Sequence, residues 1–223
     1  MEGDAAYHLG RVLRAQAGQL YELSDGEHVW LGRIDTVGRD RVQFALLEEL
    51  PAHPAGLQVT LLLAVVKFDM FEWAIEKATE LGVATIVPLS AARSDKGLLS
   101  AAGKRAERWE RILLEASQQS RRVRVPVLSA LAKPETMFAS HREGLRVMLS
   151  ELPGAPTIQK VLEGQQQSSA TLAIGPEGGW SDAEFEAACR GGFQEASLGK
   201  LILRTETVVV TALASLNYAL NEK

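Results

Sequence analysis

The residues best suited to chemistry in this sequence lie in a glycine-rich loop, IGPEGG, at positions 174–179. The loop follows a short apolar run and precedes Ser181 and Glu184, whose spacing is that of a helix capping box. Glycines let main-chain groups approach a ligand closely. Because the loop lacks lysine and carries Glu177, it does not fit a phosphate-binding loop. It favours a neutral or cationic ligand held by the backbone, with a plain tight turn as the alternative.

A second glycine loop begins at Leu198-Gly199 and leads into the segment LILRTET at positions 201–207. Thr205 can begin the last helix, and an acid such as Glu206 in the first turn is favoured by the helix dipole. A helix start does not need Arg204, which is therefore a candidate for chemistry. Two roles remain open for Glu206, that of a catalytic base and that of a helix-start residue.

A basic segment at positions 104–124 carries seven lysines and arginines against three acids. Arg121, Arg122 and Arg124 follow the end of its predicted helix, where positive charge suits the helix dipole. Such a cluster is either a solvated face or a patch that contacts phosphates. The charge pattern alone leaves both interpretations open.

Composition places the chain among ordinary globular proteins, with 223 residues, 46% of them hydrophobic, and a net charge of −4. The negative charge argues weakly against a generic nucleic-acid binder. The longest apolar run, positions 59–66, is too short to cross a bilayer, and no secretory signal is visible. We therefore expect no membrane partner and a cytoplasmic location. The single cysteine, Cys189, excludes an intramolecular disulfide and is expected in the core.

The first 55 residues are expected to form a β-rich region. A short helical pattern at positions 5–14 precedes several short strands, with turn signals at Asp25-Gly26 and at positions 38–40. Such strands predict a small barrel. A segment rich in proline at positions 49–56 is expected to be a linker.

From position 57 onward apolar strands alternate with helices, which predicts an α/β domain with a parallel sheet. The first of these helices is expected to have Asp69 as its N-cap, Glu72 completing a capping box, and Gly82 at its end. Further strands are expected at 83–89, 123–128, 145–150, 171–175 and 195–199, and helices at 103–119, after Pro134, at 157–164, from Ser181 and at 205–221.

The last predicted helix has an apolar face that either packs within the domain or forms an interface with a second copy, because helical periodicity cannot separate the two. The residues of this face are Val208, Val209, Leu213, Leu216 and Leu220.

Several motifs together closely resemble the bacterial 16S ribosomal RNA uracil-N3 methyltransferase family, which belongs to the SPOUT superfamily of S-adenosylmethionine-dependent enzymes. They are IGPEGG, the LG and ILRTET that follow it, EKATELGV at 76–83, QSRRVRVP at 119–126 and HLGRVLR at 8–14. The resemblance covers nearly the whole chain. Only seven residues precede His8, fewer than the family usually has, so we expect an incomplete barrel or a trimmed amino terminus. Val208 also stands where the family has alanine.

The resemblance implies a PUA-like RNA-binding domain at positions 1–55 and a methyltransferase domain at positions 56–223 whose carboxyl half is tied in a trefoil knot. It implies S-adenosylmethionine as cofactor, a homodimer, and 16S rRNA of the small ribosomal subunit as partner. The cofactor is expected against main-chain groups of the knotted loops. In this sequence these map to Leu149, Gly175, Pro176, Glu177, Gly178, Leu198, Gly199, Ile202, Leu203 and Arg204.

The implied reaction places the cofactor methyl on uracil N3, which requires a base for the N3 proton or a cation for the resulting anion. Arg122 is the first candidate to orient the phosphate or the uracil, Arg204 is the second, and Glu206 is a candidate base. The histidines at 8, 28, 53 and 141 lie outside the cofactor motifs, and no metal is expected. RNA contacts are expected from Arg11, Arg14, Arg121, Arg122 and Arg124.

Two other functions remain open from the sequence. The chain could be an RNA-binding or ribosome-assembly factor that keeps the fold without catalysis. It could also be a knotted methyltransferase with a different target atom, such as a ribose 2′-hydroxyl.

Overall fold

The structure, a computed structural model, describes residues 1–51, 56–140 and 143–220. The chain divides into two units, Met1–Pro54 and Ala55–Lys223, and each unit has an apolar core of its own. Part of the expected linker, the histidines at 53 and 141, and the predicted end of the last helix at 221 lie outside the described residues.

The first unit has a short helix and an antiparallel sheet. Helix α1 (Gly3–Tyr7) continues into a π-helical turn, η1 (His8–Val12), and three strands follow in the order β1-β2-β3. These strands are β1 (Leu20–Ser24), β2 (Val29–Val37) and β3 (Val42–Leu50). The small core of the unit consists of Ala6, Leu9, Ala15, Ile34 and Val42. The sheet fits the strand prediction, and closure into a barrel stays a prediction.

The second unit is built on a six-stranded sheet in the order β6-β5-β4-β8-β7-β9, in which every pairing is parallel. This confirms the predicted α/β class. Its strands are β4 (Gln58–Ala64), β5 (Thr85–Leu89), β6 (Val127–Leu128), β7 (Leu145–Leu149), β8 (Ser169–Ile174) and β9 (Gln194–Ala196).

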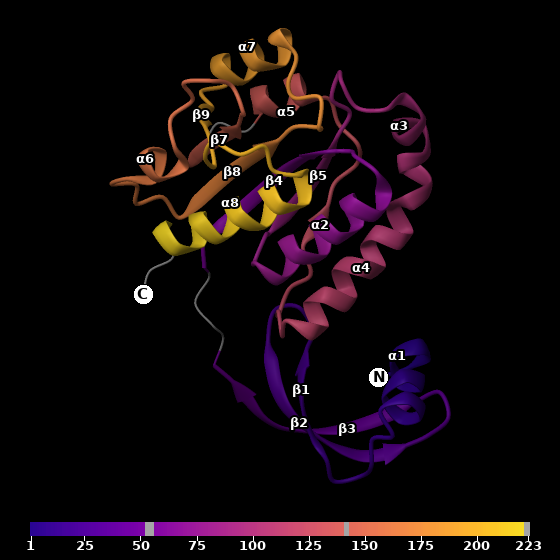
Figure 1. Ribbon diagram of the computed structural model, residues 1–223. Coiled ribbons are helices and arrows are strands. Elements are labelled where there is room, and N and C mark those ends of the chain that lie inside the picture. The colour runs from indigo at the N-terminus through magenta and orange to yellow at the C-terminus, as the bar shows by residue number, and fades with distance from the viewer. Residues whose placement is uncertain (52–55, 141–142, 221–223) are drawn as a thin grey trace. The chain divides into compact units, whose positions relative to one another are not determined.

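Helices cover both faces of this sheet. Alternate residues of a strand point to opposite sides, and here both sides carry apolar side chains that must be buried. Leu61 and Leu63 of β4 join one apolar cluster, whereas Leu62 between them joins the other. The first face packs against α2 (Phe68–Glu80), α4 (Ala106–Gln119), α6 (Ile158–Leu162) and α8 (Thr205–Leu220). The second packs against α5 (Pro134–Ser140) and α7 (Asp182–Arg190) (Figure 1).

The apolar face of α8 packs within the unit. Val209, Leu213 and Leu216 are buried in the larger core cluster, and Val208 and Leu220 pack against it. For this face the structure therefore favours core packing over an interface.

Among the described residues, no helix combines the length and the apolar composition that a membrane span needs.

Two local predictions were wrong, and one helix was not predicted. Helix α2 begins at Phe68 with Lys67 as N-cap, so Asp69 lies inside the first turn and Glu72 forms no capping box. The expected helix at 103–119 is preceded by an additional helix, α3 (Lys96–Ala102), joined to α4 by a 3-10 turn, η2 (Gly103–Arg105). Cys189 is exposed, because it lies on the outer side of α7 while its neighbours Ala187 and Ala188 face the core.

Candidate functional site

A cavity of about 640 Å³ lies at the carboxyl ends of β7, β8 and β9, and it is called the strand-end cavity below. Its walls come from the loops after these strands, from the start of α7 and from Arg93 in the loop after β5. The structure brings ten of the sequence-predicted residues together in this lining: Leu149, Gly175, Pro176, Glu177, Gly178, Leu198, Gly199, Ile202, Leu203 and Arg204. Loops far apart in the sequence therefore form one concave surface.

Glycine suits three positions of this loop, because a side chain would be crowded at 175 and 178 and the backbone would be strained at 179. A Cβ atom at Gly178 would lie 3.1 Å from the Cβ of Arg93, and one at Gly175 would lie 3.1 Å from the Trp180 indole. Gly179 has a φ of +70°, in the left-handed region that favours glycine. The backbone of this loop is consequently packed on one side and open to the cavity on the other.

Two side chains that sequence reasoning missed fix this loop in place. The Trp180 indole N–H donates to the carbonyl of Leu149, 3.0 Å away, and so joins the end of β8 to the end of β7. The Arg93 guanidinium donates to the carbonyl of Gly178 at 2.9 Å. Trp180 directly follows the glycines and could have been noticed there. Arg93 comes from a distant loop, and no local pattern points to it.

Glu184 also anchors the site from within α7. Its carboxylate accepts the backbone N–H and the hydroxyl of Ser181, each at 2.8 Å, which confirms the predicted capping box. The other carboxylate oxygen accepts the N–H of Ala92 at 2.8 Å, and the residue is 1% exposed. The helix cap therefore also holds the loop that carries Arg93.

The charge around the strand-end cavity is mostly negative. Four acids line it, Glu151, Glu177, Asp182 and Glu186, against the two bases Arg93 and Arg204. A surplus of carboxylates disfavours a phosphate and favours a cationic group. The described residues contain no cluster of histidine, cysteine and acids that could hold a metal ion.

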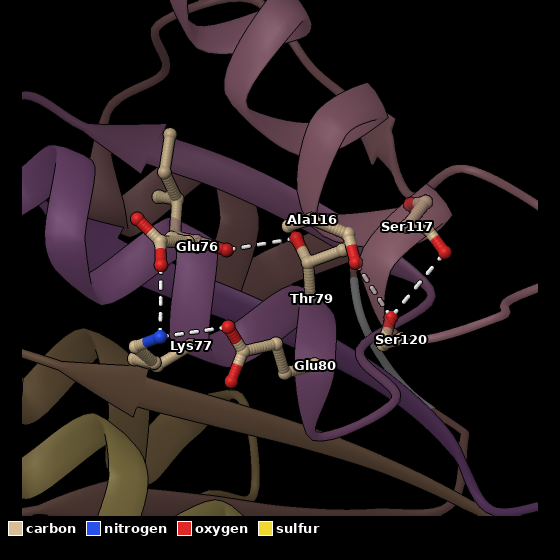
Figure 2. A network of polar contacts seen from close by, with 8 residues as sticks. Glu76, Lys77, Thr79, Glu80, Ala116, Ser117 and Ser120 are labelled. Atoms are coloured by element: carbon tan, nitrogen blue, oxygen red, sulfur yellow. Dashed lines mark hydrogen bonds and ion pairs between the residues drawn. The ribbon is translucent and has the colours of Figure 1, made fainter. Parts of the chain in front are cut away.

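Two predicted catalytic residues do not line the cavity. Glu206 lies in the first turn of α8, next to the lining residue Thr205. Arg122 lies near the carboxyl ends of α2 and α4, where it bonds to Thr79 and Ser117. Figure 2 shows the last turns of these two helices, with Thr79 and Ser117 labelled. Because α2 leads from the end of β4 to the start of β5, this is the edge of the sheet opposite the cavity.

Arg122 has a structural partner at that edge. Helix α4 ends in a turn in which Arg121 adopts a left-handed φ of 55° and the N–H of Arg122 donates to the carbonyl of Ser117. The guanidinium of Arg122 then donates to the carbonyl of Thr79 at 2.8 Å, and burial lowers its pKa from the ordinary value. Arg122 thus helps to satisfy the carbonyl groups at the end of α2.

Much of the remaining basic segment forms ion pairs within the fold. Arg105 and Arg108 of the α4 region pair with Glu72 of α2 at 3.5 Å and 2.8 Å, and Arg111 pairs with Glu115 at 3.9 Å. Glu72 therefore has a tertiary role in place of the predicted capping role. In the first unit, Arg11 and Arg14 are exposed, and Arg14 has a φ of 52°.

Comparison with known proteins identifies the family to which the chain belongs. Residues 53–217 match the family described as RNA methyltransferase domain. Ribosomal RNA small subunit methyltransferase E of Synechocystis sp. is 37% identical over 223 residues, which span 95% of this chain and 70% of that protein. The protein of the same name from Bacillus subtilis is 30% identical over 234 residues, 97% of this chain and 88% of its own. The chain therefore belongs to the ribosomal RNA small subunit methyltransferase E family.

A solved structure agrees with this assignment. The crystal structure of ribosomal RNA small subunit methyltransferase E from Neisseria gonorrhoeae, bound to S-adenosyl methionine, has a TM-score of 0.88 and 27% sequence identity to this chain. The match covers 98% of this chain and 90% of the other. The fold is therefore shared over nearly the whole chain.

Proposed function

We propose that the protein transfers the methyl group of S-adenosylmethionine to N3 of a uracil in 16S rRNA of the small ribosomal subunit. The observation that carries this proposal is the strand-end cavity. Its lining brings together residues of the family motifs from three separate loops. The family membership supports the reaction class. The uracil N3 atom follows from the resemblance of the motifs to that family.

The lining of the strand-end cavity fits S-adenosylmethionine in size and charge. Its volume of about 640 Å³ lies within the range of small-molecule sites. Carboxylates such as Glu177 suit the positive sulfonium, while main-chain groups freed by the glycines can hold the adenine and the methionyl group. When bound, the cofactor supplies an electrophilic methyl group, and apolar side chains such as Leu149 and Leu203 exclude water from it.

The finer features of the fold belong to the same proposal. We propose a trefoil knot in the carboxyl half and a PUA-like RNA-binding role for the first unit, with domains at 1–55 and 56–223. We also propose a homodimer that acts in the cytoplasm. Three apolar side chains in the cavity lining support the dimer, because Leu152, Leu201 and Ile202 are 55%, 81% and 83% exposed.

The reaction is tested by incubating the protein with labelled S-adenosylmethionine and small ribosomal subunits that lack the modification. We expect the label on a single 16S rRNA uridine, and nucleoside mass spectrometry should place the methyl on the base. A methyl on the ribose would show that the target atom is different. Transfer to no RNA at all, with normal cofactor binding, would favour the non-catalytic assembly factor.

Arg122 can reach the reacting uracil only in the cavity of another copy, since it lies at the opposite edge of its own sheet. We expect Arg122→Ala to lower the methylation rate roughly 100-fold, as misorientation of a substrate can, and to leave cofactor affinity unchanged. Loss of the bond to Thr79 should also cost about 1 kcal/mol of folding stability. Arg111→Ala is the matched control, because it removes the same charge from the exposed side of α4.

Mixing two impaired variants at limiting S-adenosylmethionine tests whether Arg122 acts across the dimer. Dimers of Arg122→Ala with Gly178→Val contain one site that combines an intact cavity with an intact Arg122 from the other copy. We expect the mixture to methylate faster than either variant alone. Normal turnover by Arg122→Ala alone would restrict the residue to capping α2.

A further inference from the structure

A second hollow, of about 570 Å³, adjoins the strand-end cavity at the carboxyl ends of β4 and β5, and we call it the Lys67 hollow. Arg93, Glu177 and Gly178 line both spaces and so form a shared wall between them. The other residues of the Lys67 hollow are Val65, Val66, Lys67, Ser94, Asp95 and Leu98. The two spaces are therefore separated by a single loop and one arginine.

The Lys67 hollow lies where this topology creates a ligand crevice. The chain leaves β4 through α2, which packs on one face of the sheet, and leaves the adjacent strand β8 through α7, which packs on the other (Figure 1). In open parallel sheets, ligands bind outside the carboxyl ends of strands where the connections diverge in this way. The strand-end cavity lies on the β7 side of this point, whereas the Lys67 hollow lies directly at it.

The frame of the hollow is fixed by the protein's own hydrogen bonds. The Ser94 hydroxyl donates to the carbonyl of Val65 at 2.9 Å, and Asp95 caps α3 by accepting the N–H of Leu98 at 3.0 Å. By contrast, no described residue forms a side-chain hydrogen bond or ion pair with Lys67 or Glu177. The charged groups of Lys67 and Glu177 can therefore meet an occupant.

The chemistry of these groups matches the edge of a uracil. Uracil presents a donor, N3–H, between two carbonyl acceptors, O2 and O4. A carboxylate on the shared wall can accept the N–H, while a lysine ammonium and an arginine guanidinium can donate to carbonyl or phosphate oxygens. Val65, Val66 and Leu98 offer apolar surface for the face of a base. An enzyme that modifies a base must also hold it in a pocket outside the helical stack.

We propose that the Lys67 hollow holds the target uridine nucleotide, with Glu177 of the shared wall facing N3 and Lys67 binding an oxygen of the base or its phosphate. This inference rests on the proposed methyl transfer and adds the place of the acceptor. It makes Lys67 and Leu98 residues of the RNA site that do not themselves line the strand-end cavity.

Lys67→Ala tests the charge. The side chain is exposed and makes no capping bond, so folding should be unaffected. We expect the KM for the small subunit to rise, and kcat/KM for methylation to fall roughly 10- to 100-fold, as loss of a charged hydrogen bond would. Calorimetry should show unchanged S-adenosylmethionine affinity. Lys96→Ala removes an equal charge nearby on α3 without lining the hollow, and should behave like the wild type.

Leu98→Trp tests whether the reaction requires the Lys67 hollow to be open. The larger side chain should fill the hollow and block both methylation and binding of small-subunit RNA in the presence of S-adenosylhomocysteine. Ser100→Trp places the same side chain at an exposed position of α3 outside the hollow and should change neither. Thermal unfolding of both variants separates blocking from misfolding.

The outcomes separate the two proposals. If the wild type methylates small subunits and both Lys67→Ala and Leu98→Trp do so with unchanged KM and rate, the Lys67 hollow is not the nucleotide site, although the methyltransferase function stands. If the wild type binds the cofactor and labels no RNA, the proposed function fails first, and this inference falls with it. A loss of methylation in both variants, with intact cofactor binding and unaffected control variants, supports the site.

Discussion

Replacing Gly178 with valine is expected to weaken S-adenosylmethionine binding roughly 10- to 100-fold, because overpacking of this size costs about 1–3 kcal/mol. A Cβ atom at this position lies 3.1 Å from the Cβ of Arg93, so the branched side chain must push either Arg93 or the loop into the strand-end cavity. The bond between Arg93 and the carbonyl of Gly178 would be strained by the same movement.

Calorimetric titration with S-adenosylmethionine measures this loss, and circular dichroism checks that the fold is kept. Gly103→Val is the matched control, since a Cβ atom there meets nothing within 4 Å and the φ of −59° suits any residue. An affinity equal to that of the wild type in the Gly178 variant would remove the glycine loop from the cofactor site.

The largest loss of stability is expected for Glu184→Ala, at about 3 kcal/mol, because the change leaves buried donors without partners. The carboxylate accepts the N–H groups of Ala92 and Ser181, so its removal unties α7 from the loop that carries Arg93. Cofactor affinity should fall together with stability for this reason.

Urea unfolding measures the change in free energy for this variant. Glu186→Ala, on the same helix, removes an exposed carboxylate that pairs with Arg190 at 3.5 Å, and it should change stability by less than about 0.5 kcal/mol. Equal midpoints for the two variants would show that the buried contacts of Glu184 contribute nothing to folding.

Much of this fold was predictable from short sequence patterns, because a helix cap or a buried strand is specified by residues that are close together in the chain. Ser181 and Glu184 form the capping box that their spacing indicates, and the strand at 57–66 is apolar because both faces of β4 are covered. Helix α3 was missed because Gly97 and Gly103 weaken its helical pattern. Asp69 and Glu72 have the spacing of a cap, yet Arg105 and Arg108 engage Glu72 from another helix.

The site was predictable only in part. Glycine loops at two strand ends could be recognised from sequence, and the family motifs supplied the remaining residues that line the cavity. Arg93 and Trp180 act through tertiary contacts with Gly178 and Leu149, which sequence spacing does not reveal. Arg122 shows the opposite case, because its motif suggested chemistry and the structure gives it a bond to Thr79.

The central claim is that the strand-end cavity binds the methyl donor, and a crystal structure of the complex with S-adenosylmethionine tests it most directly. We expect the ligand between the loops after β7, β8 and β9, with main-chain atoms of Gly175, Gly178 and Leu198 in hydrogen-bonding distance and the methyl group directed toward Glu177. A ligand bound elsewhere on the chain, with these loops open to solvent, would contradict the account.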